Sequence, residues 1–205
     1  MRLKDQAARI PQIYLGRCSS LFLFMLLAGT AIEGQQNRGV DISLDPSNTV
    51  IRWTLGDVLH TVRGTFKLKS GSIRLDPATG EMTGLVIVDA TTGESGNSAR
   101  DEQMHKKILE SSRYQTITFR PTHEIGKFDL TRDQTFTVDG VFNLHGQDHP
   151  LQLVVNVRPN SGALNLTTHF DVPYVKRGLK DPSTFILRVD KDVSIEIEAT
   201  AQVKQ

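Results

Sequence analysis

Residues 185–203 read FILRVDKDVSIEIEATAQV, a segment in which apolar and polar side chains alternate. Successive side chains of a β-strand point to opposite faces of a sheet, so this period of two indicates a strand with one buried face. Lys191 alone interrupts the apolar row, between Asp190 and Asp192. We therefore predict one long strand that bends or bulges at Lys191, as barrel strands do where they turn a corner.

The same alternation recurs through most of the chain from about residue 34 onward. It is clear in residues 62–68, 136–144 and 151–157, and weaker in residues 51–55, 117–119 and 164–170. Turn-forming residues stand at positions 69–72, 76–80, 145–148 and 159–162. Short alternating strands separated by turns are typical of antiparallel hairpins. The sequence therefore predicts an all-β fold whose sheet buries one face by closing on itself.

Only the stretch Ser98–Ser111 has the pattern of a helix. Ser98 followed by Asp101 resembles a capping box, in which each side chain satisfies an amide donor at the helix start. Met104 and Ile108 lie four residues apart and give a narrow apolar stripe. Such a helix would lie across a barrel mouth or plug one end. A surface crossover helix with no role in ligand access is the alternative, and periodicity does not separate the two.

The first 31 residues differ from the rest in composition. Four basic residues precede the apolar run Leu21–Ala28, which is shorter than the roughly 20 residues that a membrane-spanning helix needs. This order of features is typical of a secretory signal peptide, with cleavage after Ala31 or Gly34. We predict a signal peptide over residues 1–31, one domain over residues 32–205, and a periplasmic or secreted location.

Charge and cysteine content narrow the function further. Cleavage after Ala31 would leave 174 residues, enough for one domain, and would change the net charge from +1 to −2 because Asp5 and four basic residues leave. Without a clustered basic footprint, nothing indicates binding to nucleic acid. Cys18, the single cysteine, would leave with the leader. The mature chain would then have neither a disulfide nor a thiol nucleophile.

Motifs for catalysis and metal binding are weak. His145 and His149 lie four apart, but the glycine and proline that follow them indicate a turn, and a zinc site needs three or four converging ligands. The sequence lacks a Gly-x-Ser-x-Gly elbow, a phosphate-binding loop and a dinucleotide fingerprint. Glu196 and Glu198 fit a solvated strand face better than an acid–base pair. We expect no enzyme activity, no metal and no cofactor.

Three segments resemble the signature blocks of a known family. They are His60-Thr-Val-Arg-Gly-Thr-Phe66, Ser98-Ala-Arg-Asp-Glu-Gln-Met104 and Val138-Asp-Gly-Val-Phe-Asn-Leu-His-Gly-Gln-Asp-His-Pro-Leu151. In this order, behind a signal peptide, they resemble the YceI-like family of secreted, lipocalin-like polyisoprenoid-binding proteins. The resemblance covers essentially the whole mature chain. Gln103 is a departure, because the family often has histidine at that position.

The resemblance implies an eight-stranded antiparallel lipocalin-like barrel with one α-helix, enclosing an elongated apolar channel that holds an isoprenoid tail. The interior of an eight-stranded barrel is just wide enough for side chains or for one slender ligand. Burial of one five-carbon isoprene unit would contribute about 3–4 kcal/mol before ordering costs. We therefore expect affinity to depend more on tail length than on head-group chemistry.

The expected ligand-binding residues belong to the inward rows and to the helix. They are Trp53, Phe66, Leu68, Arg100, Met104, Phe119, Phe136, Phe142 and Phe170. The alternative is that these rings fill a solid core, since aromatic residues are normally buried. Only a cavity separates the two interpretations. We expect Asp101 to cap the helix, whereas Arg100 either orients a head group at the mouth or pairs with nearby backbone.

Three functions of different classes follow. The first is a periplasmic or secreted carrier that binds a polyisoprenoid lipid, a quinone or a polyprenyl chain, with transient contact to a membrane. The second is an enzyme that acts on a lipid-like substrate in the same barrel, which needs acid–base groups inside the channel. The third is a ligand-free secreted interaction module, which needs a closed and packed interior. An exposed sheet edge or an open mouth would favour a homodimer.

Overall fold

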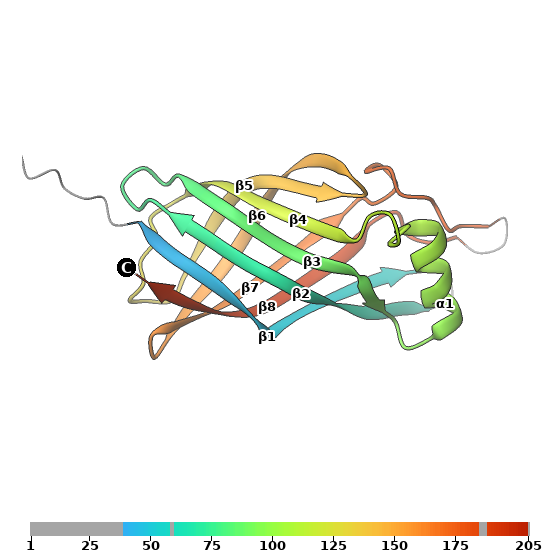
Figure 1. Ribbon diagram of the computed structural model, residues 1–205, viewed down its shortest axis with the longest axis horizontal. Coiled ribbons are helices and arrows are strands. Elements are labelled where there is room, and N and C mark those ends of the chain that lie inside the picture. Colours follow the sequence, from blue (N-terminus) through green and yellow to red (C-terminus); the bar gives the residue numbers. More distant parts are fainter. Residues whose placement is uncertain (1–38, 58–59, 185–187, 205) are drawn as a thin grey trace, which may run out of the picture. The chain divides into compact units, whose positions relative to one another are not determined.

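A computed structural model describes residues 39–57, 60–184 and 188–204 of the chain, so the predicted signal peptide and Cys18 lie outside the described residues. The described chain forms a closed antiparallel barrel in which β8 pairs with β1 (Figure 1). Its strands are β1 (Val40–Gly56), β2 (Thr61–Leu75), β3 (Met82–Glu94), β4 (Thr116–Ile125), β5 (Gln134–Leu144), β6 (Gln147–Asn160), β7 (Ala163–Val172) and β8 (Val193–Lys204). A helix, α1 (Ser98–Gln103), continues as a π-helical turn, η1 (Met104–Ile108), between β3 and β4. The prediction of an eight-stranded barrel with one helix is confirmed.

The strand predicted over residues 185–203 is shorter in the structure. β8 begins only at Val193, and residues 185–187 lie outside the described part. Before β8, Val189 forms an isolated bridge, and the ammonium group of Lys191 pairs with the carboxylate of Asp181 in the preceding loop. Lys191 therefore belongs to the end of a loop, and the prediction of a bend within one long strand at that position is wrong.

A sharp bend occurs in β1 instead. The pairing of β1 with both of its neighbours changes register after Leu44, and Figure 1 shows the strand turning there. Asp45 stabilises the bend, because its carboxylate accepts hydrogen bonds from the Ser47 amide at 2.9 Å and from the Asn48 side chain at 2.6 Å. Short polar side chains that bind nearby backbone in this way favour turns within a strand.

One of the four predicted turns is absent. Residues 69–72 lie inside β2 at a register shift, where Gly71 leaves room for the side chain of Leu44. The other three connect β2 to β3, β5 to β6, and β6 to β7. In the connection between β5 and β6, His145 and Gly146 have φ angles of 53° and 76°. Two consecutive positive φ angles are those of the tight hairpin turn that suits strand twist.

The helix begins at Ser98 as predicted, but its cap differs. Asn97 is the N-cap residue, and its side-chain oxygen accepts a hydrogen bond from the Arg100 amide at 3.0 Å. The capping box predicted from Ser98 and Asp101 is therefore wrong. Asp101 instead accepts a hydrogen bond from the Ser95 hydroxyl, so its carboxylate fixes the chain that enters the helix. Asparagine and serine cap helices about equally well.

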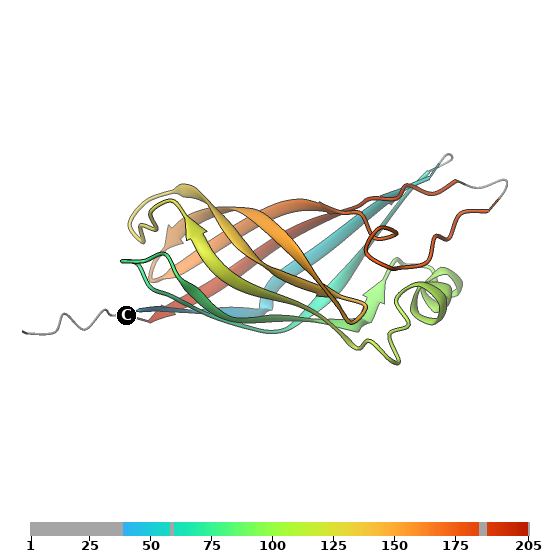
Figure 2. The same cartoon turned by 90° about the horizontal axis from the view of Figure 1, so that it is seen from above.

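The helix lies at one end of the barrel (Figures 1 and 2) and ends at Ile108 rather than at the predicted Ser111. His105 attaches it to the barrel, because one ring nitrogen lies 2.8 Å from the Gly93 carbonyl and the other 2.9 Å from the Ser111 hydroxyl. The Met104 methyl group also packs over Gly93. Within the described ranges, the structure contains no helix whose length and apolar character would let it cross a bilayer.

Apolar side chains close the barrel at the end opposite the helix. The buried members of this cluster are Val40, Ile42, Leu75, Met82, Phe136, Val138, Val157, Leu164 and Ala201. A second buried cluster lies toward the helix end and comprises Phe142, Leu144, Val172, Tyr174 and Leu179. Phe119 packs against both clusters. The barrel is therefore plugged at one end and only partly covered at the other.

Candidate functional site

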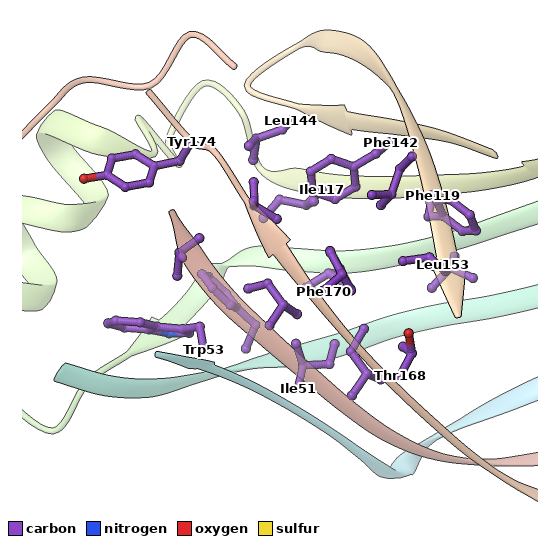
Figure 3. Close-up of a pocket in the computed structure, with 18 of the residues that line it drawn as sticks. Ile51, Trp53, Ile117, Phe119, Phe142, Leu144, Leu153, Thr168, Phe170 and Tyr174 are labelled. Atoms are coloured by element: carbon purple, nitrogen blue, oxygen red, sulfur yellow. The ribbon is translucent and has the colours of Figure 1, made fainter. Parts of the chain in front are cut away.

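An apolar cavity of about 740 Å³ lies inside the barrel. Every strand contributes to its wall, because alternate side chains of each strand point inward. Figure 3 shows Ile51, Phe119, Leu153 and Phe170, from four different strands, directed into the same space. The volume is typical of pockets that hold small molecules. A solid core, and with it a packed interaction module, does not describe this barrel.

All nine residues predicted to bind a ligand line this cavity. They are Trp53, Phe66, Leu68, Arg100, Met104, Phe119, Phe136, Phe142 and Phe170. Seven of them come from β1, β2, β4, β5 and β7, whereas Arg100 and Met104 come from α1 and η1. Phe136 belongs to the cluster at the closed end, and Trp53 lies toward the helix (Figure 3). Contact between these residues and a ligand stays a prediction.

The deep part of the cavity carries few polar groups. They are the hydroxyls of Thr49, Thr118 and Thr168. The Thr49 hydroxyl donates to the Asp45 carbonyl at 2.7 Å, whereas the buried Thr168 hydroxyl has no partner among the described residues. A wall of this kind favours a hydrocarbon guest, because hydrocarbon leaves no polar group of its own unsatisfied there.

The charged residues of the cavity wall all lie at the helix end. They are Asp57, Arg100, Lys107, Lys180 and Asp181. Asp57 follows β1, Arg100 and Lys107 belong to the helix, and the last two belong to the connection between β7 and β8. The helix and this connection lie at the same end of the barrel (Figure 2). The cavity is therefore apolar in its depth and charged at its mouth.

We call the connection between β7 and β8, residues 173–192, the mouth loop. Tyr174 attaches it to the barrel, because its side chain is only 4% exposed and is buried in the apolar cluster near the helix. Its hydroxyl donates to the Asp190 carbonyl at 2.8 Å and so joins the two ends of the loop. Burial, together with the nearby carboxylates of Asp181, Asp190 and Asp192, raises the pKa of Tyr174 to about 12. The phenol is therefore neutral and remains a hydrogen-bond donor at neutral pH.

Further contacts fix the mouth loop. Leu179 is buried in the cluster near the helix, and the guanidinium carbon of Arg177 lies 5.2 Å from the centre of the Phe142 ring. A cation above an aromatic face is attracted by the ring quadrupole. The hydrogen bond from Lys191 lowers the pKa of Asp181 to about 2, so this ion pair persists at neutral pH. The described parts of the loop, residues 173–184 and 188–192, thus have a defined conformation across part of the mouth.

Groups suited to acid–base catalysis are absent from the depth of the cavity as far as the structure describes the chain. None of the histidines lines it. His145 lies 3.1 Å from the Glu110 carboxylate and its ring contacts Tyr114, while His149 belongs to β6. Among the residues with described positions, no group of three or more His, Cys, Asp or Glu side chains is placed to hold a metal ion. The deep wall, as far as it is described, is therefore apolar apart from three hydroxyls.

The mouth residues that sequence reasoning missed include Tyr174, Lys107 and Lys180. The position of Lys107 could have been found, because it lies three residues after Met104 and seven after Arg100, on the same helix face. Tyr174 and Lys180 lie in the mouth loop. A loop has no regular side-chain period, so the sequence does not indicate which of its side chains point inward.

The fold and the cavity together define a small-ligand-binding β-barrel with an apolar lumen. Residues 43–201 match the YceI-like domain, and the chain belongs to this family. The family resemblance of the three sequence segments is thereby confirmed. No curated protein matches the chain.

Solved structures of similar fold agree with this assignment. BcnA of Burkholderia cenocepacia superposes with a TM-score of 0.65 at 15% identity, over 78% of this chain and 99% of BcnA. A polyisoprenoid binding domain from Saccharophagus degradans, implicated in plant cell wall breakdown, gives a TM-score of 0.58 at 14% identity, over 80% of this chain and 98% of that domain. The YceI protein of Campylobacter jejuni gives 0.59 at 18% identity, over 72% and 88%.

Proposed function

We propose that this protein is a carrier that holds a polyisoprenoid lipid, a quinone or a polyprenyl chain, with its tail in the barrel. The observation that carries this proposal is the apolar cavity of about 740 Å³ that is plugged at one end and opens at a charged mouth. The likeness to a polyisoprenoid binding domain from Saccharophagus degradans supports the class of ligand. We place the carrier in the periplasm or outside the cell, on the basis of the predicted signal peptide.

The driving force for loading is burial of the tail. Each five-carbon isoprene unit transferred from water into the lumen contributes about 3–4 kcal/mol, so two or three units suffice for firm binding. A branched, slender chain fits a lumen lined mainly by Leu, Ile, Val and Phe side chains. The head group then lies at the mouth, where the charged side chains are. Transient contact with a membrane follows, because such a lipid enters water only at a high cost.

An enzyme acting on a lipid-like substrate is the alternative. It would need an acid or base beside the reacting atoms inside the channel, and the titratable side chains of the described wall lie at the mouth. The carrier is therefore the better-supported function. Homodimer formation stays a prediction.

The decisive experiment is native mass spectrometry of the protein purified from its own host, followed by extraction with organic solvent. We expect bound lipids whose masses differ by isoprene steps. The delipidated protein should then bind polyprenols with an affinity that rises with each added unit until the lumen is full. Trp53, the single tryptophan, reports binding through its fluorescence because it lines the cavity. A protein that carries no lipid and shows no dependence on tail length would refute the proposal.

A further inference from the structure

We propose that the mouth of the cavity is an anion-binding site, formed by Arg100, Lys107 and Lys180, that selects isoprenoids with a phosphate or diphosphate head group over neutral ones. This inference rests on the proposed function and adds to it the chemistry of the head group.

The helix presents one charged face to the cavity. Arg100, Gln103, Met104 and Lys107 all line it, and their spacing of three, four and seven residues places them on one side of the helix. Lys106, which precedes Lys107 in the sequence, lies off this face and pairs with Glu102 at 2.5 Å. Two adjacent lysines therefore have different roles, one in a surface ion pair and the other at the mouth.

Two of the three cations have no partner within the described part of the chain. Among the residues that the structure describes, neither the Lys107 nor the Lys180 ammonium group forms an ion pair or a side-chain hydrogen bond, although both line the cavity. They come from different elements, η1 and the mouth loop. The fold therefore places both charges on the cavity wall at the mouth, where a ligand can use them.

Arg100 is held in place by the start of the helix. Its Nε donates to the Ser95 hydroxyl at 2.7 Å and its Nη2 donates to the Ser95 carbonyl at 2.9 Å. The same hydroxyl donates to the Asp101 carboxylate, which fixes the serine in turn. A guanidinium has five N–H donors, so the remaining ones are available to an oxyanion. Arg100, which sequence reasoning left between two roles, has the geometry for both.

The two carboxylates that line the cavity at the mouth are already engaged. Asp181 accepts hydrogen bonds from the Lys191 ammonium group and from the Ser183 amide. Asp57 accepts a hydrogen bond from the His60 amide at 2.8 Å, and its other oxygen lies 3.5 Å from His60 Nε2. The Asp190 and Asp192 carboxylates of the mouth loop lie near Tyr174 but do not line the cavity. On the cavity wall itself, three cations face two engaged carboxylates, so the wall at the mouth carries an excess of positive charge.

Phosphate is the anion that best matches this set. An arginine binds its oxygens in a planar fork, lysines add point charges, and a phosphate monoester carries close to two negative charges at neutral pH. Since the lumen behind the mouth is apolar, the anion must carry a hydrocarbon tail to use the whole site. The matching ligand is an amphiphile with a phosphorylated head and an isoprenoid tail.

The test compares a polyprenol with the polyprenyl phosphate of the same tail length, in wild type and in matched variants. Lys107→Gln and Lys180→Gln each remove one mouth charge. Lys106→Gln and Lys176→Gln remove a charge from the same two elements outside the cavity wall, and thermal unfolding checks that all four variants fold. Binding is measured by Trp53 fluorescence and by native mass spectrometry.

We expect wild type to bind the phosphate about tenfold more tightly than the alcohol at low salt, since each exposed ion pair adds a modest factor. The preference should fall severalfold in Lys107→Gln and in Lys180→Gln, should vanish in the double variant, and should shrink as salt screens the charges. The two control variants should keep it. Inorganic phosphate and diphosphate alone should bind far more weakly than the lipid.

Other outcomes separate this inference from the proposed function. Equal binding of alcohol and phosphate by wild type would overturn head-group selection and leave the carrier standing. Inorganic diphosphate binding as tightly as the lipid would also overturn the inference, because the site would then serve a free anion. If neither tailed compound bound, the carrier itself would be refuted, and the inference with it.

Discussion

The indole ring of Trp53 lies so close to Gly64 that a Cβ atom there would stand 2.4 Å from two indole carbons. The two residues face each other across the ladder between β1 and β2. The missing side chain lets the ring lie flat along the barrel wall (Figure 3) instead of projecting across the lumen. Gly64 therefore makes room for the ring at the wall of the cavity.

Replacing Gly64 by alanine should destabilise the barrel and shift Trp53. The new methyl group would also stand 2.0 Å from the Glu94 carbonyl, so both the ring and the backbone must move. Overpacking of this kind costs about 1–3 kcal/mol. Urea unfolding would measure the loss, and the emission of Trp53 would report the altered position of the ring.

A double-mutant cycle shows whether the indole causes part of that cost. Gly64→Ala should cost less in a Trp53→Leu background than in wild type, because one of its two clashes is gone. Equal costs in the two backgrounds would mean that the Glu94 carbonyl alone accounts for the effect.

Filling the lumen should shorten the longest tail that binds. Ala199 lines the cavity, whereas Thr200, the next residue of β8, hydrogen-bonds outside it to Asn165. We expect Ala199→Phe to weaken long polyprenols more than short ones, and the matched Thr200→Phe variant to leave the length dependence unchanged. A titration with polyprenols of increasing length measures this. Identical length profiles for both variants and wild type would place the tail elsewhere.

Most of the barrel could be predicted because apolar and polar side chains alternate in seven of its strands. The alternation also fixes the register, since a one-residue slip would put every apolar side chain on the wrong face. β3 is the exception. Its segment Leu85-Val-Ile-Val88 is a continuous apolar run whose side chains are partly buried on both faces. Such a run cannot be assigned from periodicity alone, so only the family resemblance supplied the eighth strand.

The site could be predicted where it follows from strand and helix periods. Trp53, Phe119 and Phe170 point inward because their rows alternate, and the cavity contains them all. The bends depend on interactions that periodicity does not show. Lys191 interrupts its row because Asp181 binds it, and β1 bends at Asp45 because nearby amides bind that carboxylate.

Glu124 offers a test of stability against pH. It is 4% exposed, one of its carboxylate oxygens has no partner among the described residues, and burial raises its pKa. A carboxyl group whose pKa is raised in the folded state contributes stability at low pH and loses it as the pH rises through that pKa. We expect Glu124→Gln to stabilise the barrel at pH 7 by about 1 kcal/mol, or roughly 2–4 °C in melting temperature.

The gain from Glu124→Gln should disappear below about pH 4, where the native carboxyl is already protonated. Melting curves recorded from pH 3 to pH 8 would show this convergence. Glu81, an exposed carboxylate, provides the control, since Glu81→Gln should not give this profile. A constant gain from Glu124→Gln at every pH would mean that packing, and not ionisation, explains the effect.

The Tyr174 phenol should make the stability of the folded protein depend on pH in the alkaline range. Because burial and nearby carboxylates raise its pKa from the ordinary 10 to about 12, the folded protein keeps the phenol protonated while the unfolded chain ionises. The stability that this group contributes is fully present below pH 10 and is lost as the pH rises toward 12. Tyr174→Phe should remove that loss between pH 10 and pH 12, at the cost of the 2.8 Å hydrogen bond to Asp190 at all pH values. Urea unfolding across this window, with Tyr114→Phe as the matched control, checks the prediction. An alkaline slope in Tyr174→Phe as steep as that of wild type would assign the titration to another group.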